Sequence, residues 1–232
     1  MIIVKSKSEI DLMRESGKVT GLILKELEDF IKPGLSTADI DKFVEKHIRQ
    51  HGMIAACKGY GGFPASACVS INDEVVHGIP NKKRILREGD IVSVDFCTTY
   101  KGYISDAART YPVGEVGENA SKLIKVAKES FFKGLEYCKI GNRLSDISHA
   151  IQMHVEENGF GVIRDFVGHG IGQEMHEDPQ IPNYGRPGRG PRLAEGMVFA
   201  IEPMISEGSF NVKVLSDDWT AVTIDGKLSA HY

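Results

Sequence analysis

The hydrophobic pattern of the first half predicts two helices followed by short strands. Apolar residues at helical spacing over residues 8–30 predict an amphipathic helix that Ser8 caps: Ile10, Met13, Val19, Ile23, Leu24 and Leu27. Lys32-Pro33-Gly34 ends this helix, and Ser36 or Thr37 caps a second one that runs to Gln50. Strands are predicted at 67–71, 91–98 and 102–111, the last two joined as a hairpin across residues 100–102.

The second half predicts the same order of elements. Helices are expected at 118–137 and 144–158, a Gly-rich stretch at 168–172 and a long polar loop at 179–192. Strands are expected at 197–202, 218–224 and 227–232, with a hairpin turn at Asp225-Gly226. Helices paired with antiparallel strands favour an α+β fold, with helices outside a curved sheet. Since no linker interrupts the pattern, residues 1–232 are expected to form a single domain.

An internal repeat relates the two halves at an offset of 107 residues. EGDIVSVD at 88–95 recurs as EGMVFAIE at 195–202, and the alignment holds without a gap from 32–95 to 139–202. Such a repeat indicates two copies of one αβ unit, here about residues 8–111 and 118–232, related by a pseudo-two-fold axis. Asp95 and Glu202 end the same apolar run and would face each other at that axis.

Facing carboxylates repel unless a cation or a proton lies between them, so the repeat suggests a metal site at the seam. The alternative is that both acids are solvated strand ends. Asp106 lies across the predicted hairpin from Asp95, in another largely apolar run, and His169 and His176 flank a Gly-rich turn, with His77 as a third histidine. A carboxylate-rich site with one imidazole suits Mn, Fe, Co or Zn, and several carboxylates favour two ions used for hydrolysis.

Composition narrows the class of protein. A net charge of −4 gives no electrostatic case for nucleic-acid binding, and the small basic clusters at 82–84 and 186–192 fit solvated loops. The four cysteines form no CxxC pair and are expected to be free thiols in a reducing compartment. Without a signal peptide or a membrane-spanning stretch, the expected location is the cytoplasm.

Four motifs in order, VHGIP at 76–80, the pair Asp95 and Asp106, GHGIGQEMHEDP at 168–179 and EGMVFAIEP at 195–203, resemble the bacterial type I methionine aminopeptidases. The resemblance covers nearly the whole chain. It implies the two-fold "pita-bread" (creatinase/aminopeptidase) fold, which agrees with the repeat. It also implies removal of the initiator methionine from nascent proteins by a monomeric, dinuclear metallo-exopeptidase, for which a transient contact with the ribosome is plausible.

The resemblance implies roles for individual residues. Asp95, Asp106, His169 and Glu202 would bind two metal ions, and Glu202 would accept the proton of the attacking water. His77 would contact the scissile amide, and His176 would hydrogen-bond the substrate carbonyl oxygen. The implied methionine pocket consists of Cys57, Tyr60, Phe63, Cys68, Met175 and Trp219, together with His77 and His176. Met175 stands where close relatives often carry an aromatic residue.

The sequence departs from the family at its end. The family's fifth ligand, a glutamate, would directly follow Tyr232, and the second predicted hairpin ends without an acid, so the counterpart of Asp106 is expected to be absent. Either the native chain continues with this residue, which is the favoured account, or the site lacks a bridging ligand and binds metal weakly.

The sequence leaves two other functions as alternatives. A prolidase-like peptidase would need a large N-terminal domain, for which the sequence has no residues. A non-catalytic module that has lost its metal is disfavoured by the intact Asp95, Asp106, His169, His176 and Glu202.

Overall fold

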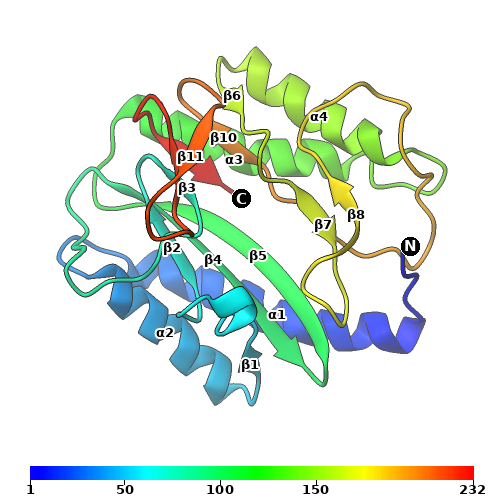
Figure 1. Ribbon diagram of the computed structural model, residues 1–232, viewed down its shortest axis with the longest axis horizontal. Helices are drawn as coiled ribbons and strands as arrows, with labels where there is room; N and C mark the ends of the chain where they lie inside the picture. Colours follow the sequence, from blue (N-terminus) through cyan, green and yellow to red (C-terminus); the bar gives the residue numbers. More distant parts are fainter.

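The computed structural model describes residues 1–232 and consists of four helices packed on antiparallel sheets (Figure 1). The α-helices are α1 (Lys7–Phe30), α2 (Thr37–Gln50), α3 (Glu118–Leu135) and α4 (Leu144–Glu157), and a short 3-10 helix η1 spans Tyr60–Gly62. The strands of the first half are β1 (Ile54–Ala55), β2 (Cys68–Ile71), β3 (Glu74–Val76), β4 (Ile91–Tyr100) and β5 (Tyr103–Pro112). Those of the second half are β6 (Gly161–Val162), β7 (Gly168–Gly170), β8 (Glu177–Ile181), β9 (Phe199–Ala200), β10 (Met204–Ser206), β11 (Val212–Val214), β12 (Ala221–Thr223) and β13 (Ser229–His231).

The predicted helices are confirmed, with one correction at the first cap. Ser6, and not Ser8, is the N-cap of α1. Its hydroxyl accepts a hydrogen bond from the Glu9 amide, and the Glu9 carboxylate accepts one from the Ser6 amide. Ser36 forms the same kind of capping box with Asp39 at the start of α2. Both helices turn an apolar face inward, where Ile23, Leu27 and Ile40 are fully buried.

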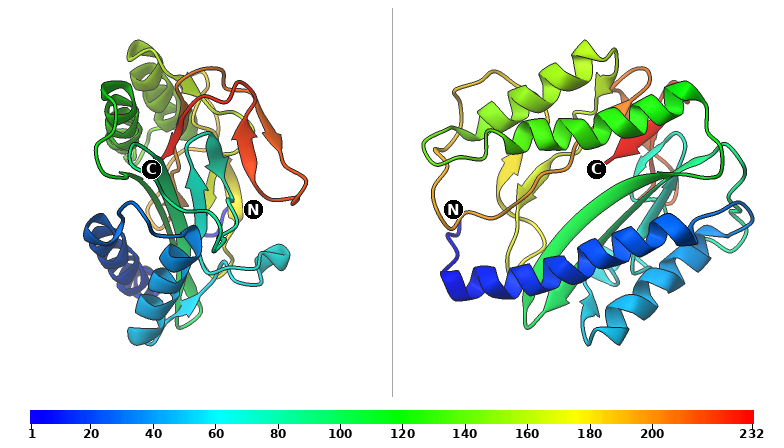
Figure 2. Two further views of the ribbon diagram at one scale, coloured as in Figure 1. Left: turned by 90° about the vertical axis from the view of Figure 1, so that its left-hand side faces the viewer. Right: turned by 180° about the vertical axis from the view of Figure 1, so that it is seen from behind.

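The hairpin β4–β5 is the longest element of the sheet, and its two strands pair over ten residues each around the turn at Lys101-Gly102. β1 and β2 pair with β4 on its other edge, which gives the sheet order β1-β4-β2 with β5 beside β4. In Figure 2 the helices lie on one side of the sheets, with α1 and α2 against strands of the first half and α3 and α4 mainly against strands of the second. The predicted α+β class, with helices outside a curved antiparallel sheet, is confirmed.

The repeat is visible in the hydrogen-bonded register as well as in the sequence. α4 begins and ends 107 residues after α2, and β6 does the same relative to β1. The pair Ile54↔Thr99 in the first half recurs as Gly161↔Ser206 in the second. The two halves are therefore structural copies as far as their second helix and the strand behind it.

The second half departs from its predicted strands in two places. The strand expected over 197–202 is broken, because Pro203 has no amide hydrogen to donate and separates β9 from β10. The hairpin expected across Asp225-Gly226 is wrong, since β12 pairs with β11 and β3 whereas β13 pairs with β10. No helix of the structure is both long enough and apolar enough to cross a membrane.

Candidate metal centre

Two acidic side chains lie on the same face of the β4–β5 hairpin. Asp106 is directly opposite Cys97, and Asp95 is opposite Ala108, so the two acids are diagonal neighbours across the pair of strands. Both side chains line the same cavity. The prediction that the hairpin brings Asp95 and Asp106 together is confirmed.

His169 comes from β7, which lies between β8 and β9. The glycines on either side allow this close packing, because a Cβ atom at Gly168 would lie 2.3 Å from the Ala200 carbonyl oxygen and one at Gly170 would lie 2.1 Å from that of Asp178. The His169 Nδ1 atom lies 2.8 Å from the Gly170 carbonyl oxygen. Since a carbonyl only accepts, Nδ1 carries a proton, and Nε2 is the atom that faces the acids.

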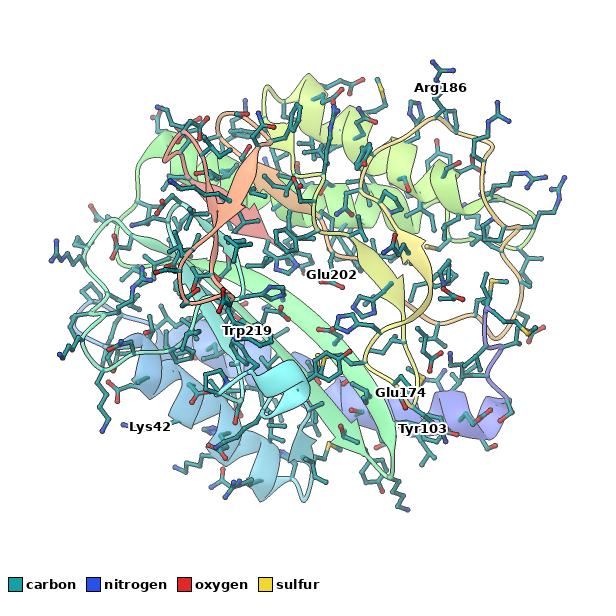
Figure 3. The ribbon with its side chains drawn as sticks, in the orientation of Figure 1. Lys42, Tyr103, Glu174, Arg186, Glu202 and Trp219 are labelled. Carbon is teal, nitrogen blue, oxygen red and sulfur yellow. The ribbon has the colours of Figure 1, made fainter.

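Glu202 lies at the break between β9 and β10, near the centre of the molecule in Figure 3. Its Oε1 atom is 3.0 Å from His169 Nε2, and the same imidazole nitrogen is 3.5 Å from Asp106 Oδ2. One ligand atom from each of Asp106, His169 and Glu202 lies within 4.8 Å of the other two. Asp95, the fourth ligand proposed from the sequence, lies outside this close group but lines the same cavity.

The charges of this group are poorly balanced by the protein alone. Burial, together with the charges of Asp106 and Glu202, raises the pKa of Asp95 well above its usual value. Burial would lower the pKa of His169, but its close contacts with the Asp106 and Glu202 carboxylates outweigh that effect and raise the pKa to about 10. Protons are thus retained where several carboxylates meet.

Glu202 shows the same imbalance at a single atom. Burial would raise its pKa, but the interactions with His169 and His231 outweigh that effect and lower it to about 2. The buried Oε1 atom nevertheless has no hydrogen bond of acceptable geometry. A buried, ionised oxygen without a donor, beside a second acid and an imidazole, fits a divalent cation with oxygen and nitrogen ligands.

The acids and histidines form the floor of a cavity of about 160 Å³. All twelve residues proposed from the sequence line it, together with Cys97: Cys57, Tyr60, Phe63, Cys68, His77, Asp95, Asp106, His169, Met175, His176, Glu202 and Trp219. Phe63 and Trp219 meet edge to face at 5.1 Å between ring centroids. Apart from the acids and histidines, the lining therefore consists of aromatic and sulfur-containing side chains.

Two further histidines border the acids. The Tyr60 hydroxyl lies 2.7 Å from His176 Nδ1, and the rings of His169 and His176 are 4.4 Å apart. Burial, and to a lesser extent the neighbouring His169, lowers the pKa of His176. His77 has a φ of 60°, an uncommon backbone conformation for a residue with a side chain, and packs edge-on against Trp219 and Phe166.

Cys97 and His231 are site residues that sequence reasoning missed. Cys97 belongs to none of the four motifs of the sequence. Side chains alternate between the two faces of β4, which places Cys97 on the same face as Asp95, and this alternation is a signal that could have identified it. His231 is buried, and its Nε2 atom is 3.6 Å from Glu202 Oε2.

The register identifies the residue that occupies the place of Asp106 in the second half, and this residue is a histidine and not an acid. Cys97 pairs with Asp106 in the first half, and its equivalent at the 107-residue offset, Met204, pairs with His231. The loop between the strands is longer in the second half, so a count of residues from the turn misses this equivalence.

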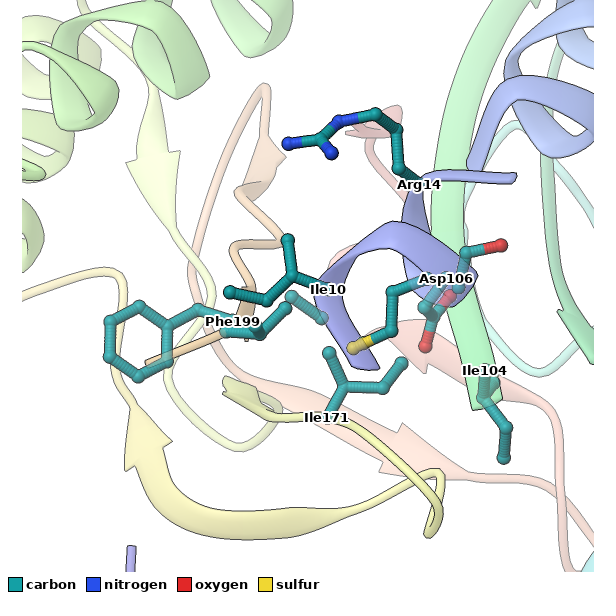
Figure 4. A pocket seen from close by; sticks show the side chains of 10 residues that line it. Ile10, Arg14, Ile104, Asp106, Ile171 and Phe199 are labelled. Carbon is teal, nitrogen blue, oxygen red and sulfur yellow. The ribbon is translucent and has the colours of Figure 1, made fainter. Parts of the chain in front are cut away.

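Asp106 also borders a second, largely apolar groove of about 310 Å³, on the side of α1 (Figure 4). Its ten lining residues come from α1, β5 and the segments of β7 and β9: Ile10, Met13, Arg14, Ile104, Ser105, Asp106, Ile171, Val198, Phe199 and Ala200. The carboxylate thus lies between two hollows, with the histidines and the other acids on one side only.

Comparison with known proteins agrees with this geometry. The model of metallopeptidase family M24 matches residues 11–225. The chain belongs to this metallopeptidase family. It is 61% identical to a methionine aminopeptidase of Clostridium acetobutylicum over 232 residues, which is all of this chain and 93% of the relative. It is 53% identical, with the same coverage, to methionine aminopeptidase 1 of Bacillus subtilis.

Solved structures of the family extend the comparison to the fold. A methionine aminopeptidase from Thermotoga maritima superimposes with a TM-score of 0.98 at 50% identity, covering 100% of this chain and 93% of that one. An X-Pro aminopeptidase from the same organism reaches 0.75 at 22% identity, with 58% of that chain covered. The second match shows a shared fold alone. The predicted pita-bread fold and the resemblance to bacterial methionine aminopeptidases are both confirmed.

Proposed function

We propose that this chain is a metal-dependent aminopeptidase that removes the N-terminal initiator methionine from nascent proteins. The observation that carries the proposal is the union of a buried acid–imidazole cluster and a sulfur- and aromatic-lined cavity in one site. Full-length relatives named methionine aminopeptidases support the same activity.

Asp95, Asp106, His169 and Glu202 would hold two divalent ions, drawn from Co, Mn, Fe and Zn. A bound divalent ion polarises a carbonyl group and lowers the pKa of a coordinated water, which is the chemistry that peptide hydrolysis needs. His169 is prepared for this role, because the Gly170 carbonyl fixes the proton on Nδ1 and leaves Nε2 toward the acids.

The remaining polar groups handle protons and the substrate. Glu202 accepts the proton of the attacking water, since its carboxylate is ionised in the buried site. The Tyr60 hydroxyl lies 2.7 Å from His176 Nδ1 and would donate to it, which leaves the proton of the neutral imidazole on Nε2 for the substrate carbonyl oxygen. His77, fixed between Trp219 and Phe166, contacts the scissile amide.

The cavity sets the preference for the first residue. Its volume of about 160 Å³ corresponds to roughly five water molecules, which suits one unbranched side chain. Cys57, Cys68 and Met175 present polarisable sulfur, and Tyr60, Phe63 and Trp219 present aromatic faces, both of which interact favourably with a thioether.

We also propose the setting in which the enzyme works. Both halves contribute ligands, which supports one catalytic domain over residues 1–232, acting as a monomer. The substrates are peptides and nascent chains that begin with methionine, in the cytoplasm and with a transient contact to the ribosome.

The test is methionine release from the peptide Met-Ala-Ser by protein supplied with Mn²⁺ or Co²⁺. We expect release from Met-Ala-Ser, little from Leu-Ala-Ser, and none from either after thorough chelation. Asp106→Asn and His169→Ala should each lower kcat/KM by at least about 100-fold, since each removes a ligand at the reacting centre.

Phe132→Ala is the matched control, because this side chain is exposed on α3, outside the cavity. Turnover that survives chelation would refute the metal mechanism. Equal rates on the methionine and leucine peptides would refute the assignment of the pocket.

A further inference from the structure

His231 is the one buried side chain near the metal centre with no evident partner. Its exposed fraction is 1%, and neither Nδ1 nor Nε2 has a hydrogen-bond partner. A buried polar group without partners costs free energy, and native proteins rarely retain one without a reason. The position of His231 supplies one.

The pseudo-two-fold repeat places His231 where the first half has a proposed metal ligand. The pair Met204↔His231 on β10 and β13 repeats the pair Cys97↔Asp106 on β4 and β5. The imidazole consequently faces the same seam as Asp106. The Glu202 carboxylate lies between two imidazoles, with Oε1 3.0 Å from His169 Nε2 and Oε2 3.6 Å from His231 Nε2.

The backbone of His231 is held firmly. Its amide donates to Thr110 Oγ1 at 2.8 Å, and the same hydroxyl donates to the His231 carbonyl oxygen at 2.9 Å. Ser93 Oγ lies 2.7 Å from Thr110 Oγ1 and completes this buried anchor. Since both peptide groups of His231 are bound to β5, the imidazole has a fixed origin and only its side-chain torsions to adjust.

We propose that His231 is a positioning residue for the metal centre, whose Nε2–H donates to Glu202 Oε2 and thereby directs Oε1 toward Asp106 and His169. The contact tightens by less than about 1 Å to reach the length of a charge-assisted hydrogen bond. The inference deepens the proposed metal centre and rests on it. Outer groups of this kind orient ligands in metal sites generally.

The test is Mn²⁺ binding to the metal-free protein, measured by calorimetry without any peptide. His231→Met removes the donor at similar side-chain length, and we expect it to weaken Mn²⁺ binding by about 10–100-fold. His231→Gln keeps an N–H that can reach Glu202 and should remain close to wild type. His231→Asn, with a shorter amide, should behave like the Met variant.

His47 provides the matched control, because its Nε2 atom lies 3.7 Å from Glu26 Oε2, a similar pair outside the cavity. His47→Met should leave Mn²⁺ binding unchanged. Equal loss in the Gln, Met and Asn variants would indicate a merely structural role and overturn the proposal, as would unchanged binding in all three.

A second measurement separates this inference from the proposed function. In the metal-free protein, His231→Met should cost more in urea unfolding in the wild-type background than in Glu202→Leu, where no oxygen remains to accept from His231. If the wild type bound no Mn²⁺, the metal-dependent function would fail. The double-mutant cycle would still decide the His231–Glu202 contact, and equal effects in both backgrounds would overturn it.

Discussion

A buried ion pair ties the N-terminal segment to the turn that carries His176. Lys5 and Glu177 are joined through Nζ and Oε2, and their side chains are only 3% and 5% exposed. The other carboxylate oxygen of Glu177 accepts a hydrogen bond from the Gln173 amide at 3.1 Å, so the same acid binds both Lys5 and the start of the turn. A Cβ atom at Gly172 would lie 2.5 Å from both Glu177 Oε1 and Lys5 Cε, so a larger residue there would displace the ion pair.

Replacing Lys5 with Met should therefore be costly. The substitution leaves the Glu177 charge buried without its partner, and breaking a buried pair from one side costs about 3–5 kcal/mol. Total unfolding free energies of domains are about 5–15 kcal/mol, so the loss is a large share. The double variant Lys5→Met/Glu177→Gln should recover most of it, because the amide oxygen can still accept from the turn while no charge remains.

Urea unfolding of the metal-free protein measures these differences. Lys18→Met is the matched control, since Lys18 and Glu15 form a pair with side chains 62% and 52% exposed, worth less than about 1 kcal/mol. Peptide turnover should also fall in Lys5→Met. The turn that Glu177 holds contains Met175 and His176, which line the cavity, and a loosened turn would hold them less firmly in place. The reasoning is refuted if Lys5→Met costs no more than Lys18→Met, or if the double variant is as unstable as the single one.

Three further predictions follow from packing, charge and metal binding. Gly134→Ala should destabilise by about 1–2 kcal/mol, because its Cβ would lie 2.8 Å from Ile151 Cγ1, whereas Gly21→Ala, with open space around it, should stabilise by about 0.5–1 kcal/mol; equal signs in urea unfolding would contradict this. Hydrogen bonds from Ser6 and then Tyr103 lower the pKa of Glu9 from 4.5 to about 2, so the ionised Glu9 stabilises the fold fully above pH 4.5 and loses this effect as pH falls toward 2. The difference in unfolding free energy between wild type and Glu9→Gln should therefore shrink over that range, and a difference that grows would contradict this reasoning. Mn²⁺ at 100 times its Kd should raise Tm by roughly 5–10 °C, from about 2.7 kcal/mol of binding linkage, and His169→Ala should abolish the shift in a thermal scan.

The sequence predicted the site more completely than it predicted the strands around it. Asp95 and Glu202 were found because an acid ending the same apolar run twice is a signal of pairing across a pseudo-two-fold axis. Asp106 was found because it lies across a predicted hairpin from Asp95, and His169 because it lies in a Gly-rich turn. Helix bounds were also close, since caps and apolar spacing are local properties. β6, β7 and β8 were missed because strands of two to five residues carry almost no period of their own and are defined by their neighbours.

His231 shows where a pattern of residues stops being informative. A lone histidine in a short strand gives no chemical signal, and only the pairing with Met204 reveals that it occupies the place of Asp106. Cys97 is a milder case, because β4 is long enough for its alternation to be read once the strand is known. Both misses concern residues whose meaning depends on register between segments far apart in sequence.

The second half differs from the first in that its strand is interrupted at Pro203, yet it keeps the acid, Glu202, that corresponds to Asp95. Asp95 lies within a continuous strand, with its backbone in the ladder, whereas the backbone of Glu202 is released because β9 ends at Ala200 and β10 begins at Met204. The freed Glu202 carbonyl would be an unsatisfied buried group, but Asn183, fully buried in the long polar loop, donates to it at 2.7 Å. The polar loop over 179–192 thus supplies the hydrogen bond that a neighbouring strand would otherwise provide. One consequence is that the backbones of the equivalent acids are held differently, that of Asp95 by pairing with the neighbouring strands and the carbonyl of Glu202 by a side-chain amide from the long loop.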